Sequence, residues 1–337
     1  MEIYEPTSRE RGELPRILAL CGPTGVGKTE LSLQLAERLG AELVNMDSVQ
    51  VYRGLDIGSA KASPAERARV PHHLIDILAP DEDHNVGDFI ASATSVIEDV
   101  RARGKHAIVV GGTGLYLRGV VHGLMEAPPP SPEIRARHGE LVAEHGRARL
   151  HEMLVEVDPE LAERLHPNDT VRTSRGLEVF EQTGRLLSVM QREHAFRAPN
   201  YDALKLALVR PRAQLYARID RRVDAMIEEG LLEECRALFD AYPRDTKSLG
   251  SLGYRQLAPH LLDGVEIAEC VQAVKKQTRR YAKQQLGWLR SEPGVVWAQA
   301  PLLDDAGRVP DEVVGSARGF LEGGDPDLGW ADADPYQ

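Results

Sequence analysis

The chain has 337 residues, 42% of them hydrophobic and 28% charged, and a formal net charge of −11. This composition excludes a disordered or fibrous protein, and no apolar run approaches the roughly 20 residues that span a bilayer. The three cysteines, Cys21, Cys235 and Cys270, are too far apart for a disulfide framework or a C-x-x-C zinc site, so we expect a protein of the reducing cytoplasm.

Strand-like and helix-like segments alternate through the first 130 residues. Helical patterns cover residues 28–39 and 87–103. Apolar runs that are typical of buried strands occupy residues 16–21, 41–47, 73–78 and 106–112. Because strands that alternate with helices favour a parallel sheet with crossover connections, we predict an α/β fold.

The pattern changes after the proline triplet at residues 128–130. Helix starts at Ser131-Pro132, Asp158-Pro159 and Asn168-Asp169 predict a helical insertion. A strand at residues 204–209 then returns to the sheet, and helices dominate residues 212–241 and 266–291. We expect a core of residues 1–130 and 201–300, a helical insertion domain of residues 131–200, and an acidic, flexible tail of residues 301–337.

The negative charge is concentrated at the end of the chain. Residues 301–337 contain nine acidic and two basic residues, which leaves a net charge of only −4 on residues 1–300. Residues 275–290 contain six basic residues and no acid, interleaved with Tyr281, Trp288 and three glutamines. This run is compatible with a solvated helix face or with an RNA-binding surface, so the overall acidity does not exclude a nucleic-acid partner.

A phosphate-binding loop is the strongest local signal. Residues 22–29, GPTGVGKT, match G-x-x-x-x-G-K-[ST], follow a predicted strand and open a predicted helix. Loop N–H groups and Lys28 would bind phosphate oxygens, and Thr29 would hold Mg²⁺. The fold expected is therefore a P-loop NTPase-like parallel sheet. The predicted diphosphate- or nucleotide-binding residues are Gly22, Pro23, Thr24, Gly25, Val26, Gly27, Lys28 and Thr29.

Two further strand ends carry polar groups. Asp47 directly follows the second predicted strand, and the ends of parallel strands share one crevice, so its carboxylate would face Lys28. It would hold Mg²⁺ or accept a proton, although an aspartate that caps a turn is the simpler interpretation. Thr113 lies in the glycine cluster Gly111-Gly112-Thr113-Gly114, which is either a second ligand loop or a plain turn.

Taken together, these motifs resemble the tRNA dimethylallyltransferases, in the bacterial form without a Cys/His zinc module. The resemblance runs in order from about residue 16 to residue 297. Its most specific parts are DSVQVYRGLDIGSAK at residues 47–61 and GSLGYRQL at residues 250–257. The other parts are GPTGVGKT (22–29), PHHLIDI (71–77), VVGGTGLY (109–116), HPNDTVRTSRGLEVF (166–180) and the basic run at residues 275–290.

The resemblance implies transfer of a dimethylallyl group from dimethylallyl diphosphate to N6 of adenosine 37, next to the tRNA anticodon. The P-loop would then bind the leaving pyrophosphate, with Mg²⁺ as the cofactor. Asp47 is implied as the general base, Thr24 and Lys28 as partners of the leaving group, and Arg222 as a clamp on it. Arg218 lies on the same helix face as Arg222 and is the alternative clamp on the pyrophosphate, and either arginine would instead form a surface ion pair with Asp220 or Asp224.

The resemblance also implies tRNA contacts. Gln50 would recognise an adenine edge, and Tyr254 would either stack on a base or pack between helices. The implied tRNA-binding residues are Asp47, Ser48, Val49, Gln50, Thr113, Arg135, Val171, Arg172, Thr173, Ser174, Arg175, Gly250, Ser251, Leu252, Gly253, Tyr254 and Arg255. We expect a monomer with no membrane partner.

Three alternative activities use the same loop. A P-loop small-molecule kinase would transfer phosphate from ATP, but it has no use for GSLGYRQL or for the basic run. An RNA-binding NTPase would leave the RNA unmodified. A prenyltransferase for free adenine nucleotides would need less chain after residue 200.

Overall fold

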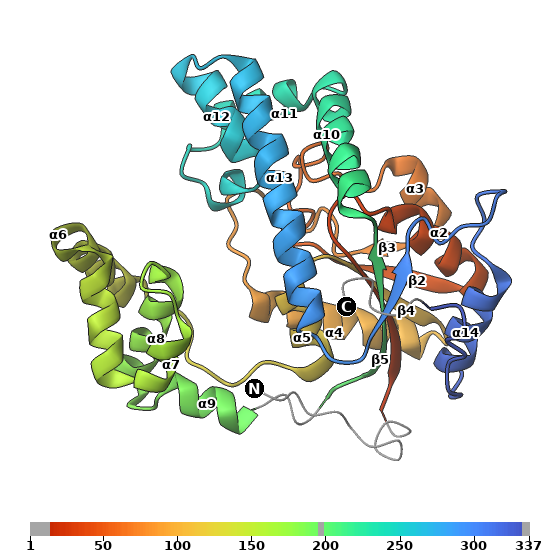
Figure 1. The fold of residues 1–337 in the computed structure, drawn as a ribbon, viewed down its shortest axis with the longest axis horizontal. Helices are drawn as coiled ribbons and strands as arrows, with labels where there is room; N and C mark the ends of the chain where they lie inside the picture. Colours follow the sequence, from red (N-terminus) through yellow and green to blue (C-terminus); the bar gives the residue numbers. More distant parts are fainter. Residues whose placement is uncertain (1–13, 195–198, 332–337) are drawn as a thin grey trace. The chain divides into compact units, whose positions relative to one another are not determined.

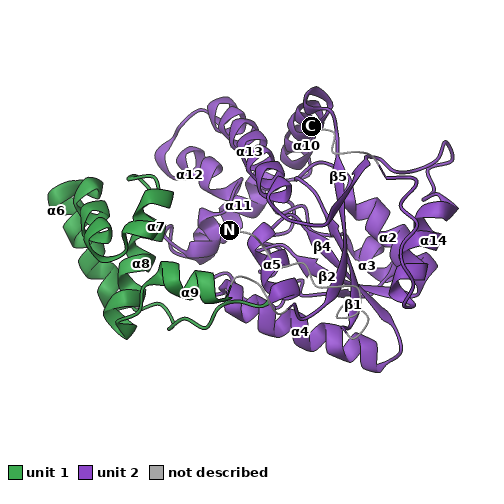
Figure 2. Cartoon of the chain, turned by 60° about the horizontal axis from the view of Figure 1, so that its bottom comes forward, with its two compact units in different colours: residues 1–6, 123–198 green, residues 7–122, 199–337 purple. Residues whose placement is uncertain are grey.

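The computed structural model describes residues 14–194 and 199–331, which form two compact units (Figure 2). Residues 123–194 belong to one unit, and residues 14–122 and 199–331 to the other. The helical unit thus begins at Gly123, before the residue 131 expected for the insertion. None of the helices in the described part of the chain combines the length and apolar character needed to cross a membrane.

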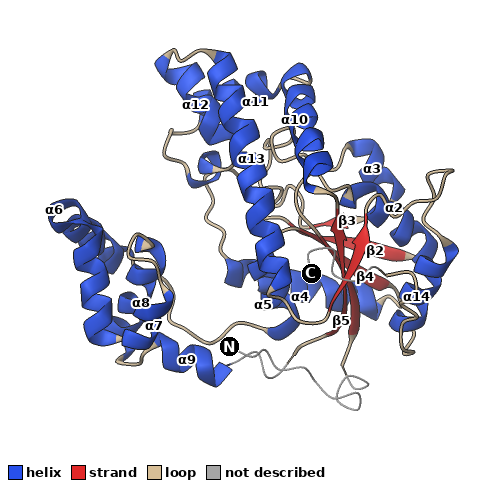
Figure 3. Ribbon diagram, viewed as in Figure 1, coloured by secondary structure: helices blue, strands red, loops and turns tan. Residues whose placement is uncertain are grey.

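A six-stranded parallel sheet forms the centre of the larger unit (Figures 1 and 3). The strand order is β3-β2-β4-β1-β5-β6. The strands are β1 (Arg16–Cys21), β2 (Ala41–Met46), β3 (His72–His73), β4 (His106–Gly111), β5 (Asp202–Val209) and β6 (Val295–Gln299). All neighbouring pairs run parallel, which confirms the predicted α/β fold.

Helices cover both faces of this sheet because side chains of a strand point alternately to opposite faces. Leu18 and Leu20 of β1 pack with α2 (Lys28–Leu39) and α14 (Asp311–Leu321). Ile17, Ala19 and Cys21 of the same strand belong to the opposite core, with α4 (Val86–Ala102) and α5 (Gly114–His122). The near-continuous apolar character of β1 follows from burial on both faces.

A separate apolar core joins the helices that follow β5. These are α10 (Arg212–Glu228), α11 (Leu231–Ala241), α12 (Tyr254–Asp263) and α13 (Ile267–Arg290). Helices dominate residues 212–241 as predicted, and Gly230, at φ 103°, separates α10 from α11. Val51 and Leu55, from the segment after β2, are buried in the same core. The core therefore fixes that segment against the helices, with α3 (Pro64–Arg69) and a 3₁₀ turn at Lys247–Gly250 completing the larger unit.

The smaller unit is helical and has its own core. It consists of α6 (Pro132–Val157), α7 (Pro159–Arg164), α8 (Thr170–Thr183) and α9 (Leu187–His194), with a break in α6 at Gly146. Side chains of Ser131, Asp158 and Asp169 cap α6, α7 and α8, as their sequence positions predicted. Leu150, Leu154, Leu161 and Leu177 bring the helices together.

Two expectations from the sequence are wrong. Residues 73–78 do not form a strand beyond His73, because Leu74 and Asp76 have φ near +60°, which is incompatible with extended pairing. Residues 301–331 are not a flexible tail. Helix α14 buries Val313, Val314 and Phe320 against the core of the larger unit. Residues 332–337 lie outside the described part of the chain.

Candidate active site

A polar cavity of about 860 Å³ opens at the carboxyl ends of β1, β2 and β4 in the larger unit. Ligands of open α/β sheets bind at this edge. Its walls come from the P-loop, residues 47–50, residues 58–60, residues 110–112 and residues 251, 252 and 255, with side chains of α10 and α13. The cavity therefore brings together the P-loop, the segment that begins at Asp47, the second glycine cluster, GSLGYRQL and the basic run.

The P-loop adopts the backbone needed to bind an anion. Gly25 and Gly27 have φ of 78° and 112°, which glycine adopts readily. Helix α2 begins at Lys28 without a side-chain cap, so its first N–H groups face the loop. The Lys28 ammonium group donates to the carbonyls of Gly22 at 2.8 Å and Pro23 at 3.1 Å. Burial and the nearby Arg222 charge lower the pKa of Lys28 to about 8.

Asp47 lies at the cavity wall and also closes a turn. One carboxylate oxygen accepts from the backbone N–H groups of Val49 at 2.8 Å and Gln50 at 3.3 Å. The turn-capping interpretation of this aspartate is therefore confirmed, and Asp47 also lines the cavity. Its roles as a proton acceptor and as a Mg²⁺ ligand stay predictions. Its negative charge acts on Lys28, Arg222 and Tyr281, whose pKa values it raises.

The two arginines of α10 face the P-loop rather than the acids beside them. Arg218 donates from Nε to the Gly25 carbonyl at 3.1 Å, and both Arg218 and Arg222 line the cavity. Burial lowers the pKa of Arg222, although the Asp47 charge raises it. The ion pairs expected with Asp220 and Asp224 do not involve these arginines, because α13 supplies the partners of both acids.

Helix α13 contributes a polar face to the cavity. Tyr281 and Gln285 are four residues apart and share this face. Burial and the Asp47 charge raise the pKa of Tyr281 to about 12, and the nearby polar side chains of Thr113 and Gln285 oppose this shift. The phenol is therefore protonated at neutral pH. Gln285 is buried and contacts both glycine loops.

Two of the six basic residues of the run on α13 form ion pairs with acids of α10. Lys275 pairs with Asp224 at 2.6 Å, and Arg279 pairs with Asp220. Lys276, Arg280 and Lys283 are exposed, and Arg280 lines the cavity. The paired residues Lys275 and Arg279 therefore fit neither interpretation of the run, and the exposed residues stay compatible with a solvated face or with an RNA-binding surface.

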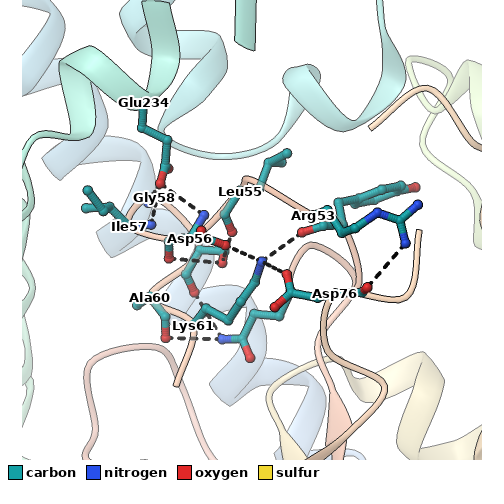
Figure 4. A network of polar contacts seen from close by, with 12 residues as sticks. Arg53, Leu55, Asp56, Ile57, Gly58, Ala60, Lys61, Asp76 and Glu234 are labelled. Atoms are coloured by element: carbon teal, nitrogen blue, oxygen red, sulfur yellow. Dashed lines mark hydrogen bonds and ion pairs between the residues drawn. The ribbon is translucent and has the colours of Figure 1, made fainter. Parts of the chain in front are cut away.

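The loop after Asp47 is fixed by a polar network (Figure 4). Gln50 donates its side-chain amide to the carbonyls of Ser59 and Ala60, at 3.0 and 3.3 Å. The ammonium group of Lys61 contacts the Tyr52 carbonyl, Asp56 and Asp76. These contacts close residues 50–61 into a compact loop.

The implied tRNA-binding residues divide between the two units. In the larger unit, residues 47–50, 251, 252 and 255 line the cavity, and Thr113 lies next to Tyr281. Tyr254 is fully buried, so the stacking expectation is wrong and the packing alternative holds. Gly250 ends the 3₁₀ turn, and Gly253 has φ 95° at the start of α12.

In the smaller unit, the implied residues cluster on and beside α8. Arg135 and Arg175 both pair with the buried Glu178. Thr173 is buried, and Ser174 contacts His138, so neither hydroxyl is directed at solvent. Val171 is 79% exposed, and Arg172 is also exposed. Of the implied tRNA-binding residues on α8, the two exposed ones therefore lie in its first turn.

Sequence reasoning did not assign Tyr281, Gln285, Arg280, His72 or residues 58–60 to the cavity. The spacing of Tyr281 and Gln285 on one helix face was an available signal. No local sequence signal placed His72 or residues 58–60 in the cavity, because the paths of these loop and strand-end residues depend on tertiary packing. No group of three or more His, Cys, Asp or Glu side chains that would hold a metal occurs within residues 14–194 and 199–331.

Comparisons with known proteins agree with this geometry. Residues 50–292 match the family model "IPP transferase" and residues 15–75 the model "Isopentenyl transferase". The chain is 49% identical to tRNA dimethylallyltransferase 1 of Citrifermentans bemidjiense over 85% of its length and 92% of that protein. It is also 49% identical to the tRNA dimethylallyltransferase of Syntrophobacter fumaroxidans, covering 87% of this chain and 85% of that one.

Solved structures give the same result. The tRNA isopentenylpyrophosphate transferase of Bacillus halodurans matches with a TM-score of 0.65 and 38% identity over 91% of this chain and 96% of that one. A eukaryotic dimethylallyltransferase, solved acting on tRNA, matches with a TM-score of 0.81 and 27% identity over 94% and 82% of the two chains. The chain therefore belongs to the IPP transferase family, the family of the tRNA dimethylallyltransferases.

Proposed function

We propose that this protein transfers a dimethylallyl group from dimethylallyl diphosphate to N6 of adenosine 37, next to the tRNA anticodon. The observation that carries the proposal is the placement of the P-loop and Asp47 in one cavity of a chain that belongs to this family. The new bond joins N6 to the allylic carbon, the allylic C–O bond breaks, and pyrophosphate leaves with the electron pair.

The P-loop side of the cavity would stabilise the leaving group. As the C–O bond lengthens, negative charge grows on the pyrophosphate, and fixed positive groups lower the barrier. The α2 N-terminus, Lys28 and Arg222 supply that charge, and Arg218 holds the loop through Gly25. The Thr24 hydroxyl would donate to the bridging oxygen. In this role the loop binds a product and has no phosphate to transfer.

Asp47 would accept the proton that N6 loses. Its carboxylate is held at the cavity wall by its own turn, so it does not need to reorganise during the reaction. Its negative charge raises the pKa values of Lys28 and Arg222, which connects the proton acceptor to the leaving-group side. The adenine must leave the anticodon-loop stack to reach this carboxylate.

Mg²⁺ fits the donors present. This ion is commonly held by one or two protein oxygens, water and substrate phosphates, and not by a full protein cage. Thr29 and Asp47 offer a hydroxyl and a carboxylate in the same cavity. When bound, Mg²⁺ would neutralise part of the diphosphate charge.

The tRNA would contact exposed residues of both units. Lys276, Arg280 and Lys283 on α13, Arg255 on α12, and Arg172 on α8 provide exposed cations. The phosphate backbone supplies the electrostatic part of such binding. The three cysteines are free and buried, which suits the proposed cytoplasmic location. A monomer remains our expectation.

Mass spectrometry of tRNA after incubation with dimethylallyl diphosphate and Mg²⁺ tests the proposal. A mass gain of one dimethylallyl group on the adenosine beside the anticodon is expected. Asp47→Asn should bind tRNA normally and lose at least roughly a hundredfold in turnover, whereas Asp99→Asn, on the exposed face of α4, should be normal. Folded protein that leaves tRNA unmodified, or that transfers the γ-phosphate of ATP to a small acceptor, overturns the proposal.

A further inference from the structure

Glu234 of α11 binds three consecutive backbone amides of the loop that follows Asp47 (Figure 4). One carboxylate oxygen accepts from Asp56 at 3.1 Å and from Ile57 at 2.7 Å. The other accepts from Gly58 at 3.0 Å. A carboxylate that satisfies three neighbouring N–H groups fixes their relative orientation, since each bond constrains a different peptide plane.

The same carboxylate also binds the first residue of α12. The Tyr254 hydroxyl donates to Glu234 at 2.7 Å, and the ring is completely buried. Burial and the Glu234 charge raise the pKa of Tyr254, so the phenol stays protonated and keeps donating. A Cβ atom at Gly58 would lie 2.5 Å from the Tyr254 ring. The loop and the start of α12 are thus closely packed as well as hydrogen-bonded.

Both of these segments continue into the cavity wall. After Gly58, the carbonyls of Ser59 and Ala60 hold the side-chain amide of Gln50. On either side of Tyr254, Leu252 and Arg255 line the cavity. Glu234 itself does not line it within the described residues. Any effect of Glu234 on a ligand must therefore act through the wall residues that these two segments hold, among them Gly58, Gln50 and Arg255.

We propose that Glu234 is the positioning residue for the acceptor side of the cavity. Through residues 56–60 and Tyr254, it holds Gln50 and Arg255 in the arrangement that receives the RNA. This inference rests on the proposed function, because it assigns those walls to the RNA acceptor. On the diphosphate side, Lys28 donates to the carbonyls of Gly22 and Pro23, and the charges that act on Arg222 are those of Asp47, Arg218 and Glu229, so among the described residues neither group has Glu234 as a partner.

The two sides of the cavity predict different kinetic effects. If Glu234 orders only the acceptor side, its loss raises KM for tRNA and leaves KM for dimethylallyl diphosphate unchanged. A general loosening of the fold would change both parameters or neither, and would appear as a lower Tm. The split between the two KM values therefore distinguishes positioning from stability.

Glu234→Gln and Tyr254→Phe test the proposal, with Glu233→Gln as the matched control. Glutamine replaces one accepting oxygen with an NH₂ group, which faces N–H donors and breaks part of the network. Glu233 is the adjacent, exposed residue of the same helix. We expect Glu234→Gln to raise KM for tRNA roughly tenfold, the cost of about one buried hydrogen bond to a charged group. Tyr254→Phe should also raise KM for tRNA, but by less, and Glu233→Gln should leave KM for tRNA unchanged.

A double variant tests whether Glu234 acts on tRNA binding through Gln50. Gln50→Ala should add little to Glu234→Gln, because both remove the same ordered wall. An unchanged KM for tRNA in Glu234→Gln, or equal increases in both KM values, overturns the positioning role. If Glu234→Gln does not fold, Tyr254→Phe decides the question by the same measurement. A wild-type protein that modifies no tRNA instead overturns the proposed function, so the two failures are distinct.

Discussion

The side chain of Gln285 accepts a hydrogen bond from the Thr24 backbone N–H at 2.8 Å, across 261 residues of chain. Its amide nitrogen donates to the Gly112 carbonyl at 3.1 Å. One buried carboxamide on α13 therefore fixes the distance between the P-loop and the second glycine loop. A Cβ atom at Gly112 would lie 2.2 Å from this amide, so only glycine permits the contact.

Replacing Gln285 should weaken binding of dimethylallyl diphosphate and leave binding of tRNA unchanged. Gln285→Leu removes both hydrogen bonds at similar volume, and we expect KM for dimethylallyl diphosphate to rise roughly tenfold. Steady-state kinetics with each substrate varied in turn measure this. Gln272→Leu changes an exposed glutamine on the same helix and serves as the control. A normal KM for the diphosphate would show that the P-loop holds its shape without Gln285.

Pyrophosphate binding should weaken as pH rises through 8. The pKa of Lys28 is lowered to about 8, so its ammonium group is charged below that pH and neutral above it. An anion binds the charged form better, so the affinity should fall between pH 7 and pH 9. Calorimetric titration of the wild type and Lys28→Met measures this. The ligand's own ionisation affects both proteins, so equal slopes would contradict the role of Lys28.

Lys283 and Lys275 should respond differently to loss of charge. Lys283→Gln removes an exposed cation, so tRNA affinity should fall and the slope of log K against log salt should decrease by about 1. Lys275→Gln breaks the ion pair with Asp224, so it should change Tm more than the salt slope. Filter binding across a salt series checks both. A reduced salt slope in Lys275→Gln alone would reverse the assignment.

Glu292 should be a large contributor to stability. It is buried after the end of α13 and pairs with Lys205 at 2.8 Å and Arg118 at 2.9 Å. Burial raises its pKa, but His122, Lys205 and Arg118 more than offset this and lower the pKa to about 2. Glu292→Gln leaves these cations without a counter-charge, so we expect a loss of about 3–5 kcal/mol in the free energy of unfolding.

Urea denaturation measures this loss, with Glu98→Gln on the exposed face of α4 as the control. In the wild type, the contribution of Glu292 is fully present above its unfolded-state pKa of about 4.3. It is lost as pH falls from there through the folded-state pKa of about 2. A loss in Glu292→Gln no larger than the control would contradict this account.

Two glycine-to-alanine substitutions should change the free energy of unfolding in opposite directions. At Gly114 a Cβ atom would lie 1.9 Å from the Trp288 ring, which the Arg118 guanidinium also covers at 4.8 Å. Gly114→Ala should therefore cost about 1–3 kcal/mol. Gly139 lies in α6 with nothing within 4 Å of an added Cβ, so Gly139→Ala should gain up to about 1 kcal/mol from helix propensity. Thermal denaturation distinguishes them, and a stabilised Gly114→Ala would contradict the packing.

The sequence alone predicted four of the six strands (β1, β2, β4 and β5) and the P-loop, because these features depend on local patterns, but it did not predict β6. An apolar run buried on both faces identifies β1, and G-x-x-x-x-G-K-T places Lys28 at the start of α2. The capping residues Ser131, Asp158 and Asp169 predicted three helix starts, since a cap acts within one turn. The strand at residues 73–78 failed because apolar content does not reveal a positive φ at Leu74.

Only the tertiary structure decided what each polar side chain of the later helices contacts. Composition grouped Lys275 and Lys283 in one basic run, but helix geometry directs one to Asp224 and the other to solvent. Gln285 and Glu234 reach partners that are 261 and 176 residues away in the chain. The acidity of residues 301–337 predicted disorder, yet Val313 and Phe320 at helical spacing bury α14 in the core. Charge counts describe a segment by itself, whereas contacts depend on the surfaces that the fold places beside it.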